Sequence, residues 1–278
     1  MRVLGAADVA AALDARGAVD ALEDALRAGL DVDADPPRGS LPVGAGELLV
    51  MPSSQGAVKL VTVGGDPRIQ GVCVVFDRET LAPAAILDGI ALTNLRTAAV
   101  SALAVRWLAA PDPRRALILG RGPQGVAHAE ALRAVAPTLE VVDVVGRGAA
   151  PEIESYDLIC CATTAREPLF DGARVADHAT VVAIGSHEPD AREVDAALAG
   201  RATVVVESRA TALREAGDVV LAIGEGALDA GALIELGSLI RGESEAATAV
   251  DAARPRLFKS TGMAWEDAVV ASAVVAGA

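Results

Sequence analysis

Aromatic and basic residues are scarce in this sequence. Two Trp, one Tyr and three Phe make up 2% of its 278 residues, so a site in which ring faces stack on nucleobases or sugars is not expected. The 24 Lys and Arg residues are outnumbered by 38 Asp and Glu, which gives a net charge of −14. A chain with this charge repels the phosphate backbone, so nucleic acid is not an expected partner.

Cysteine is also rare, and long hydrophobic runs are missing. The three cysteines, Cys73, Cys160 and Cys161, lack the number and spacing of a disulfide framework or a zinc site. We expect buried thiols, with the adjacent pair on opposite faces of a strand, and no metal. No apolar segment reaches the roughly 18 residues of a membrane span. The charged N-terminus does not resemble a signal peptide, so a cytoplasmic protein without a membrane partner is expected.

Hydrophobic residues nevertheless make up 52% of the chain. With so few aromatics, the core has to consist of Ala, Val, Leu and Ile, which suits helices packed on a parallel sheet. The first part of the chain has a helical pattern over residues 6–29 and again over 93–109. Between these helices we predict strands of a mixed or antiparallel sheet at Glu47–Met51, Val58–Val63, Gly71–Phe76 and Ala84–Leu87.

Beyond Pro111 and Pro113, which end the second helix, apolar strands alternate with helices. We predict strands at Ala116–Leu119, Val141–Val145, Leu158–Ala162, Thr180–Ile184 and Thr203–Val206. Short β-branched runs of this kind are typical of a parallel sheet that is buried on both faces. The last segment, from Trp265 onward, is predicted to be one more helix.

The turn after the first of these strands carries a G-x-G-x-x-G motif formed by Gly120, Gly122 and Gly125, with Pro123 and Gln124 between the last two glycines. The first glycine allows a tight turn, the second allows the backbone to approach a pyrophosphate, and the third allows close helix packing. The preceding strand and following helix give the motif its meaning, because a helix N-terminus binds phosphate. A dinucleotide-binding site is therefore predicted.

The end of the second strand distinguishes NAD from NADP. An acidic residue there accepts a hydrogen bond from the ribose 2′-OH of NAD, but this chain has Val145, Gly146 and Arg147. Because a guanidinium can hold a 2′-phosphate, Arg147 favours NADP, with NAD as the alternative. Asp143, inside the strand, is the residue that argues for NAD. Only eleven residues, Gly146 to Tyr156, lead to the third strand. The crossover helix is therefore expected to be reduced to a turn or two.

Several segments together resemble the ornithine cyclodeaminase and mu-crystallin family. Besides the glycine motif they are VKLVTV from Val58, LTNLRTAAVS from Leu92, REPL from Arg166, EAGD from Glu215 and LFKSTG from Leu257. The resemblance implies a homodimer of an α/β protein. A Rossmann domain, residues 113–254, is expected to be inserted into a smaller α+β domain for substrate binding and dimerisation, residues 1–112 plus 255–278.

The resemblance also implies the roles of site residues. Arg38, Lys59 and Arg96 match residues that bind a substrate carboxylate, and Lys59 also matches a proton donor. Independently of the family, cations set among apolar residues need a partner or a ligand that supplies one. The residues that match positions lining the dinucleotide are Thr97, Thr163, Ile184 and Ser260.

His187 stands where the similar cyclodeaminases have an aspartate that handles the substrate amine. The change favours a reductase, which has to deliver hydride to an imine and protonate its nitrogen, and an imidazole with a pKa near ~6.5 can supply that proton. The sequence therefore predicts an NADP-dependent imine (ketimine) reductase or amino-acid dehydrogenase for a small α-imino or α-amino acid. An ornithine cyclodeaminase and a non-catalytic NADPH-binding protein are the alternatives.

Overall fold

The structure, a computed structural model, describes residues 1–243, 250–251 and 253–278. The chain forms two compact units: unit 1 contains Met1–Val100 and Met263–Ala278, and unit 2 contains Ser101–Gly262. The first division lies inside helix α3 (Gly89–Leu108), before the expected boundary at residues 112/113. The last turns of α3 belong to unit 2, where the Leu108 carbonyl accepts a hydrogen bond from Arg256 Nε at 2.9 Å.

Unit 1 is built on a six-stranded sheet with the order β1-β6-β5-β4-β3-β2. Its strands are β1 (Arg2–Leu4), β2 (Gly39–Val43), β3 (Gly46–Ser53), β4 (Ala57–Val63), β5 (Ile69–Phe76) and β6 (Pro83–Asp88). All neighbours pair antiparallel except β1, which is parallel to β6. The four predicted strands are confirmed. Strand β2 escaped prediction because it is an exposed edge strand that contains Pro42, a residue tolerated only at sheet edges.

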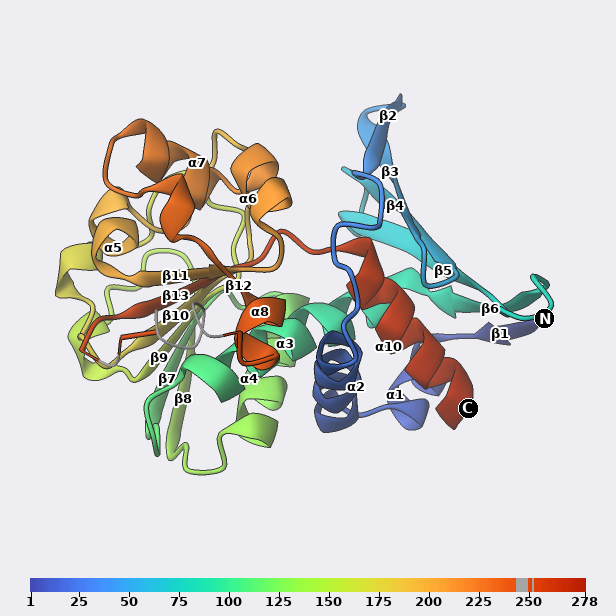
Figure 1. The fold of residues 1–278 in the computed structure, drawn as a ribbon, viewed down its shortest axis with the longest axis horizontal. Helices are drawn as coiled ribbons and strands as arrows, with labels where there is room; N and C mark the ends of the chain where they lie inside the picture. The colour runs from blue at the N-terminus through green and yellow to red at the C-terminus, as the bar shows by residue number, and fades with distance from the viewer. Residues whose placement is uncertain (244–249, 252) are drawn as a thin grey trace. The chain divides into compact units, whose positions relative to one another are not determined.

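The helix α10 (Ala264–Gly277) packs on one face of this sheet, α1 (Ala6–Ala12) packs against α10 and β6, and α2 (Ala15–Arg27) packs against α10 (Figure 1). The single helix predicted over residues 6–29 is wrong. The chain is extended at Leu13, and the carboxylate of Asp14 caps α2 by accepting a hydrogen bond from the Gly17 amide at 2.7 Å. Such a cap favours a break, although the apolar spacing continues across it.

Unit 2 contains a seven-stranded parallel sheet with the order β12-β11-β13-β10-β9-β7-β8. Its strands are β7 (Arg115–Leu119), β8 (Val141–Val145), β9 (Leu158–Cys161), β10 (Thr180–Ala183), β11 (Thr203–Val206), β12 (Ile234–Glu235) and β13 (Arg256–Lys259). The parallel, Rossmann-type sheet confirms the α/β prediction. Strand β13 was not predicted as a strand because two of its four residues are cations.

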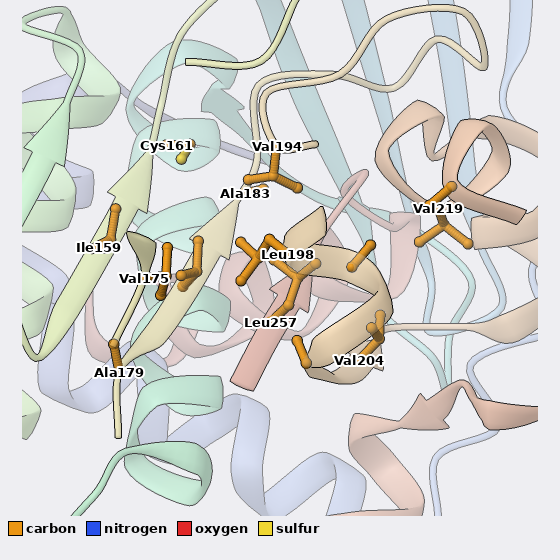
Figure 2. Packing of buried hydrophobic residues seen from close by; sticks show 14 of the residues in the cluster. Ile159, Cys161, Val175, Ala179, Ala183, Val194, Leu198, Val204, Val219 and Leu257 are labelled. Carbon is orange, nitrogen blue, oxygen red and sulfur yellow. The ribbon is translucent and has the colours of Figure 1, made fainter. Parts of the chain in front are cut away.

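Helices cover both faces of the parallel sheet. Figure 1 shows α5 (Ala196–Arg201), α6 (Arg209–Glu215) and α7 (Gly217–Gly224) on one side, and α4 (Pro123–Val135) and α8 (Leu236–Ile240) on the other. Aliphatic side chains fill the core beneath the first three helices, with Leu198 of α5 set above the strands (Figure 2). Cys161 lies in this core, whereas the equally buried Cys160 points to the opposite face, and both thiols are free.

The connection from β8 to β9 contains one short 3-10 turn, Ile153–Ser155, and no α-helix. The predicted shortening of this crossover is therefore confirmed. Across the described ranges, every helix is too short or too polar to cross a membrane.

Candidate functional site

Four charged side chains, Lys59, Arg96, Glu266 and Asp267, gather in the apolar interior of unit 1. Lys59 Nζ lies 2.9 Å from Asp267 Oδ1 and 2.7 Å from its Oδ2. Arg96 reaches both carboxylates, with Nη1 2.8 Å from Glu266 Oε2 and Nε 3.0 Å from Asp267 Oδ1. All four side chains are buried. Two cations balance two carboxylates, which is the condition under which buried charges are tolerated. We call this set the carboxylate–cation cluster.

The sequence positions this cluster through strand alternation and a helix start. Lys59 points to the same face of β4 as the buried Ala57 and Val61, and this is the face on which α10 packs. Glu266 and Asp267 lie in the first turn of α10, where the helix dipole favours negative charge. Sequence reasoning missed both carboxylates, because an acidic first turn usually faces solvent. The signal was the surrounding sequence, which is apolar all round the helix and so predicts a buried one.

Burial changes the proton affinity of the cluster. Desolvation lowers the pKa of Lys59 from 10.5 to about 8; Arg96 adds to this effect, and Asp267 opposes it. An ammonium with this pKa is mostly protonated at neutral pH and yields its proton far more easily than an ordinary lysine. Cys73, the cross-strand neighbour of Lys59, has its pKa raised to about 12 by burial, so its thiol stays protonated.

The other predicted residues of unit 1 lie at different depths. Thr97 follows Arg96 in α3 and is buried, whereas Arg38 lies just before β2 and is half-buried. Arg38 is not one of the four residues of the carboxylate–cation cluster. The structure thus brings together Lys59 and Arg96 and links them through Asp267.

In unit 2, the glycine turn between β7 and α4 has the shape that the motif predicts. Gly120 has a φ of 128°. A Cβ at Gly120 would lie 2.2 Å from the Ala162 carbonyl oxygen, and a Cβ at Gly125 would lie 1.9 Å from that of Gly120. At Gly122 a Cβ would meet no atom within 4 Å. Since α4 starts here without a side-chain cap, its first N–H groups and the space beside Gly122 fit a pyrophosphate.

A buried carboxylate joins the loops that follow two neighbouring strands. Glu193 accepts hydrogen bonds from the Thr163 amide at 2.8 Å, the Thr163 hydroxyl at 2.7 Å and the Gly185 amide at 2.7 Å. Thr163 follows β9 and Gly185 follows β10, so Glu193 fixes both loops at the carboxyl end of the sheet. In open α/β sheets, ligands bind at this end. Burial raises the pKa of Glu193.

A buried ion pair between Asp218 and Lys259 holds the main chain at Glu193. Asp218 accepts hydrogen bonds from the Glu193 amide at 2.7 Å and pairs with Lys259 Nζ at 2.8 Å. Lys259 Nζ also donates to the Ser186 carbonyl at 2.7 Å. We call Glu193, Asp218 and Lys259 the loop clasp. Sequence analysis missed it because its partners are mostly backbone groups, which leave no trace in side-chain patterns.

The clasp places several predicted residues near one another. Ile184 and His187 belong to the loop that Glu193 and Lys259 hold, and both are half-buried. Ser260 directly follows Lys259, and its hydroxyl donates to Glu207 Oε1 at 2.5 Å.

Arg147 is exposed and lies just beyond β8. Asp143, the residue that argued for NAD, accepts a hydrogen bond from the Tyr156 hydroxyl at 2.8 Å.

Comparisons with known proteins show which family of sequences this chain matches. The model of the ornithine cyclodeaminase/mu-crystallin family matches residues 1–151 and 142–277. The Δ1-pyrroline-2-carboxylate reductase of Colwellia psychrerythraea is 32% identical over 235 residues, which cover 75% of this chain and 73% of the relative. The ketimine reductase mu-crystallin of Mus musculus is 33% identical over 227 residues, 75% of this chain and 69% of the relative.

A solved structure is similar over the full length of the chain. It is the Δ1-pyrroline-2-carboxylate reductase of Thermococcus litoralis in complex with NADH and L-proline. Its TM-score is 0.86 at 26% identity, and the match covers 100% of this chain and 97% of that one.

Proposed function

Because the chain belongs to the ornithine cyclodeaminase/mu-crystallin family, we propose that it is an NAD(P)H-dependent oxidoreductase that reduces the C=N bond of a small α-imino acid. The match to relatives named pyrroline-2-carboxylate reductase and ketimine reductase over 75% of the chain carries this proposal. The glycine turn and the carboxylate–cation cluster support it, because one fits a dinucleotide and the other contains cations for an acid substrate.

In unit 2, the glycine turn would hold the cofactor pyrophosphate through Gly120, Gly122, Pro123, Gln124 and Gly125. When bound, the reduced nicotinamide supplies the hydride. Thr163, Ile184 and Ser260 are further residues of this unit that we propose to line the dinucleotide. We favour NADP over NAD because Arg147, and no acidic residue, follows β8.

In unit 1, Arg96 and Lys59 would bind the substrate carboxylate, with Arg38 as a third cation. Lys59 is the proposed proton donor, since its pKa of about 8 suits an ammonium that has to give up a proton near neutral pH. Lys59 would give its proton to the nitrogen of the C=N bond, whose carbon would take the hydride. The product is an amine, and the neutral Lys59 regains a proton from water. His187 is the second candidate for the donor.

We further propose a cytoplasmic homodimer. The three free cysteines suit a reducing compartment. On the sheet face of unit 1 turned away from α10, strand neighbours place apolar side chains in rows: Val50, Val58, Leu60, Val72, Val74 and Ile86. A contiguous apolar face indicates a protein interface, and a second copy of the same face is its simplest apolar complement.

A direct assay tests the proposed reaction. Mixing the protein and NADPH with Δ1-pyrroline-2-carboxylate or Δ1-piperideine-2-carboxylate should oxidise the cofactor, which its absorbance reports, and Lys59→Met should abolish the signal. Failure to oxidise NADPH with any cyclic imine, or with 2-oxo acids plus amines, contradicts the proposal. Proline and ammonia formed from ornithine would identify a cyclodeaminase instead. Tight NADPH binding without any turnover would identify a non-catalytic binding protein.

A further inference from the structure

One side chain of the glycine turn reaches away from the pyrophosphate position. Arg121 lies between Gly120 and Gly122 and is exposed. Its Nε donates a hydrogen bond to the main-chain oxygen of Val144 at 3.4 Å. A Cβ on Gly146 would lie 3.4 Å from Arg121 Cδ and 3.7 Å from its Nε. The Arg121 side chain therefore crosses from the turn after β7 to the end of β8 and lies over Gly146.

This strand end is where a Rossmann domain contacts the ribose that carries the adenine. Its chemistry here is cationic: Arg121 lies over Gly146, and Arg147 follows that glycine. The carboxylate within β8, Asp143, is engaged by Tyr156. Among the residues that the structure describes, neither Arg121 nor Arg147 forms an ion pair with a carboxylate. Arg114, at the other end of β7, does pair with Glu140 at 2.7 Å.

Two cations at one strand end are notable in a chain with a net charge of −14, because acidic partners are abundant elsewhere on it. A phosphate monoester carries close to two negative charges and offers three oxygen acceptors. Guanidinium groups bind such a group with paired hydrogen bonds. The hydrogen bond from Nε to the Val144 carbonyl orients the Arg121 side chain. Its two Nη groups can then donate hydrogen bonds to phosphate oxygens.

The short crossover between β8 and β9 is a second reason to consider side chains as the phosphate-binding groups at this strand end. The segment between β8 and β9 has a 3-10 turn of three residues and no α-helix, so helix N–H groups do not contribute to anion binding there. At this strand end the donors available to a phosphate are the exposed Arg121 and Arg147 side chains and the main-chain N–H groups of the loop.

We propose that Arg121, together with Arg147, binds the 2′-phosphate of NADP(H), and that Arg121 sets the preference for NADP over NAD. The inference rests on the proposed function only in that the glycine turn binds a dinucleotide. It does not depend on which substrate is reduced, and it can be tested without any substrate.

Isothermal titration calorimetry with adenosine 2′,5′-bisphosphate and with 5′-AMP measures the contribution of the 2′-phosphate to binding, because the two ligands differ only in this group. The wild-type protein should bind the bisphosphate about 100-fold more tightly than 5′-AMP, since each charge-assisted contact adds roughly a factor of 10. Arg121→Ala and Arg147→Ala should each lose about 10-fold in affinity for the bisphosphate and less than about 2-fold for 5′-AMP. Arg121→Lys should keep part of the preference, and Arg114→Ala, the matched control, should keep all of it.

Fluorescence titration with NADPH and NADH should give the same ratios for the full cofactors. Equal affinity of the wild-type protein for the two ligands of a pair overturns the proposal. So does a loss in Arg121→Ala that is the same for both ligands, or a preference that survives this change. If the preference behaves as expected but no imine is reduced, the proposed reaction alone is refuted. If imines are reduced with equal affinity for NADPH and NADH, the 2′-phosphate site alone is refuted.

Discussion

Lys59 and Asp267 form a buried ion pair, although they lie 208 positions apart in the sequence. Strand β4 packs against α10, which brings Lys59 Nζ to 2.7 Å from Asp267 Oδ2. Arg96 binds the same carboxylate at 3.0 Å. One side chain of the C-terminal helix therefore contacts both of the residues that we propose to bind the substrate carboxylate.

We predict that Asp267→Asn shifts the pH dependence of imine reduction to lower pH. Asp267 raises the pKa of Lys59, which burial has lowered to about 8. Without the carboxylate, this pKa falls further. If protonated Lys59 is the acid, the rate declines as pH rises through the Lys59 pKa, so the decline should begin at lower pH in the variant. A pH profile of kcat/KM measures this.

Asp267→Glu keeps the charge and should restore most of the wild-type profile. A variant that is slower by the same factor at every pH would show that Asp267 only maintains the structure. That result would also argue that Lys59 is not the proton donor.

Two glycines of the dinucleotide turn should respond differently to alanine. Gly122→Ala should leave the free energy of unfolding nearly unchanged, because a Cβ there meets no atom within 4 Å. It should weaken NADPH binding at least about 10-fold, since the methyl group takes space proposed for the pyrophosphate. Gly125→Ala should weaken NADPH binding and, unlike Gly122→Ala, should also destabilise unit 2, because its Cβ would lie 1.9 Å from a carbonyl oxygen.

Urea unfolding and NADPH titration separate the two effects. The prediction fails if Gly122→Ala binds NADPH normally, because the open space beside this residue would then not be the cofactor site.

The loop clasp should matter for the cofactor more than for the substrate. In Glu193→Gln, one oxygen is replaced by an amide nitrogen that cannot accept a hydrogen bond from the Thr163 or Gly185 N–H group. The loops after β9 and β10 should loosen, and we expect the KM for NADPH to rise about 10-fold, in line with the loss of one charge-assisted hydrogen bond.

The exposed Glu188, which pairs with Arg166 in the same loop region, provides the control. Glu188→Gln should change the KM for NADPH by less than about 2-fold, since exposed ion pairs contribute little. Equal effects of the two changes, or an effect of Glu193→Gln on the imine KM alone, would contradict the assignment.

The apolar face of the unit 1 sheet should prove to be a dimer contact. Leu60→Glu places a charge in the middle of this face and should convert a dimer into a monomer, as measured by light scattering coupled to size-exclusion chromatography. Leu213→Glu, at an exposed position of α6 in unit 2, is the matched control and should stay dimeric. A monomeric wild-type protein, or a dimeric Leu60→Glu variant, would refute this interface.

Local patterns in the sequence predict much of this fold. The β-branched runs of the parallel sheet and the glycine turn carry their own signals, so strands such as β8 appear at the predicted residues. Structure that depends on distant partners was not predictable in this way. In the sequence, Glu266 and Asp267 are an ordinary acidic helix start, and only the fold shows that Lys59 of the distant strand β4 pairs with Asp267. Glu193 binds backbone amides, and no residue pattern marks where those amides lie.

The helix-free crossover between β8 and β9 has a practical consequence for cofactor analogues. In the dinucleotide site proposed here, the adenine lies beside a segment with a single 3-10 turn, so few protein atoms are available to enclose it. Bulky groups attached to the adenine ring should therefore be tolerated. The protein should bind etheno-adenine NADP, or NADP attached to a resin through its adenine amino group, nearly as tightly as the natural cofactor.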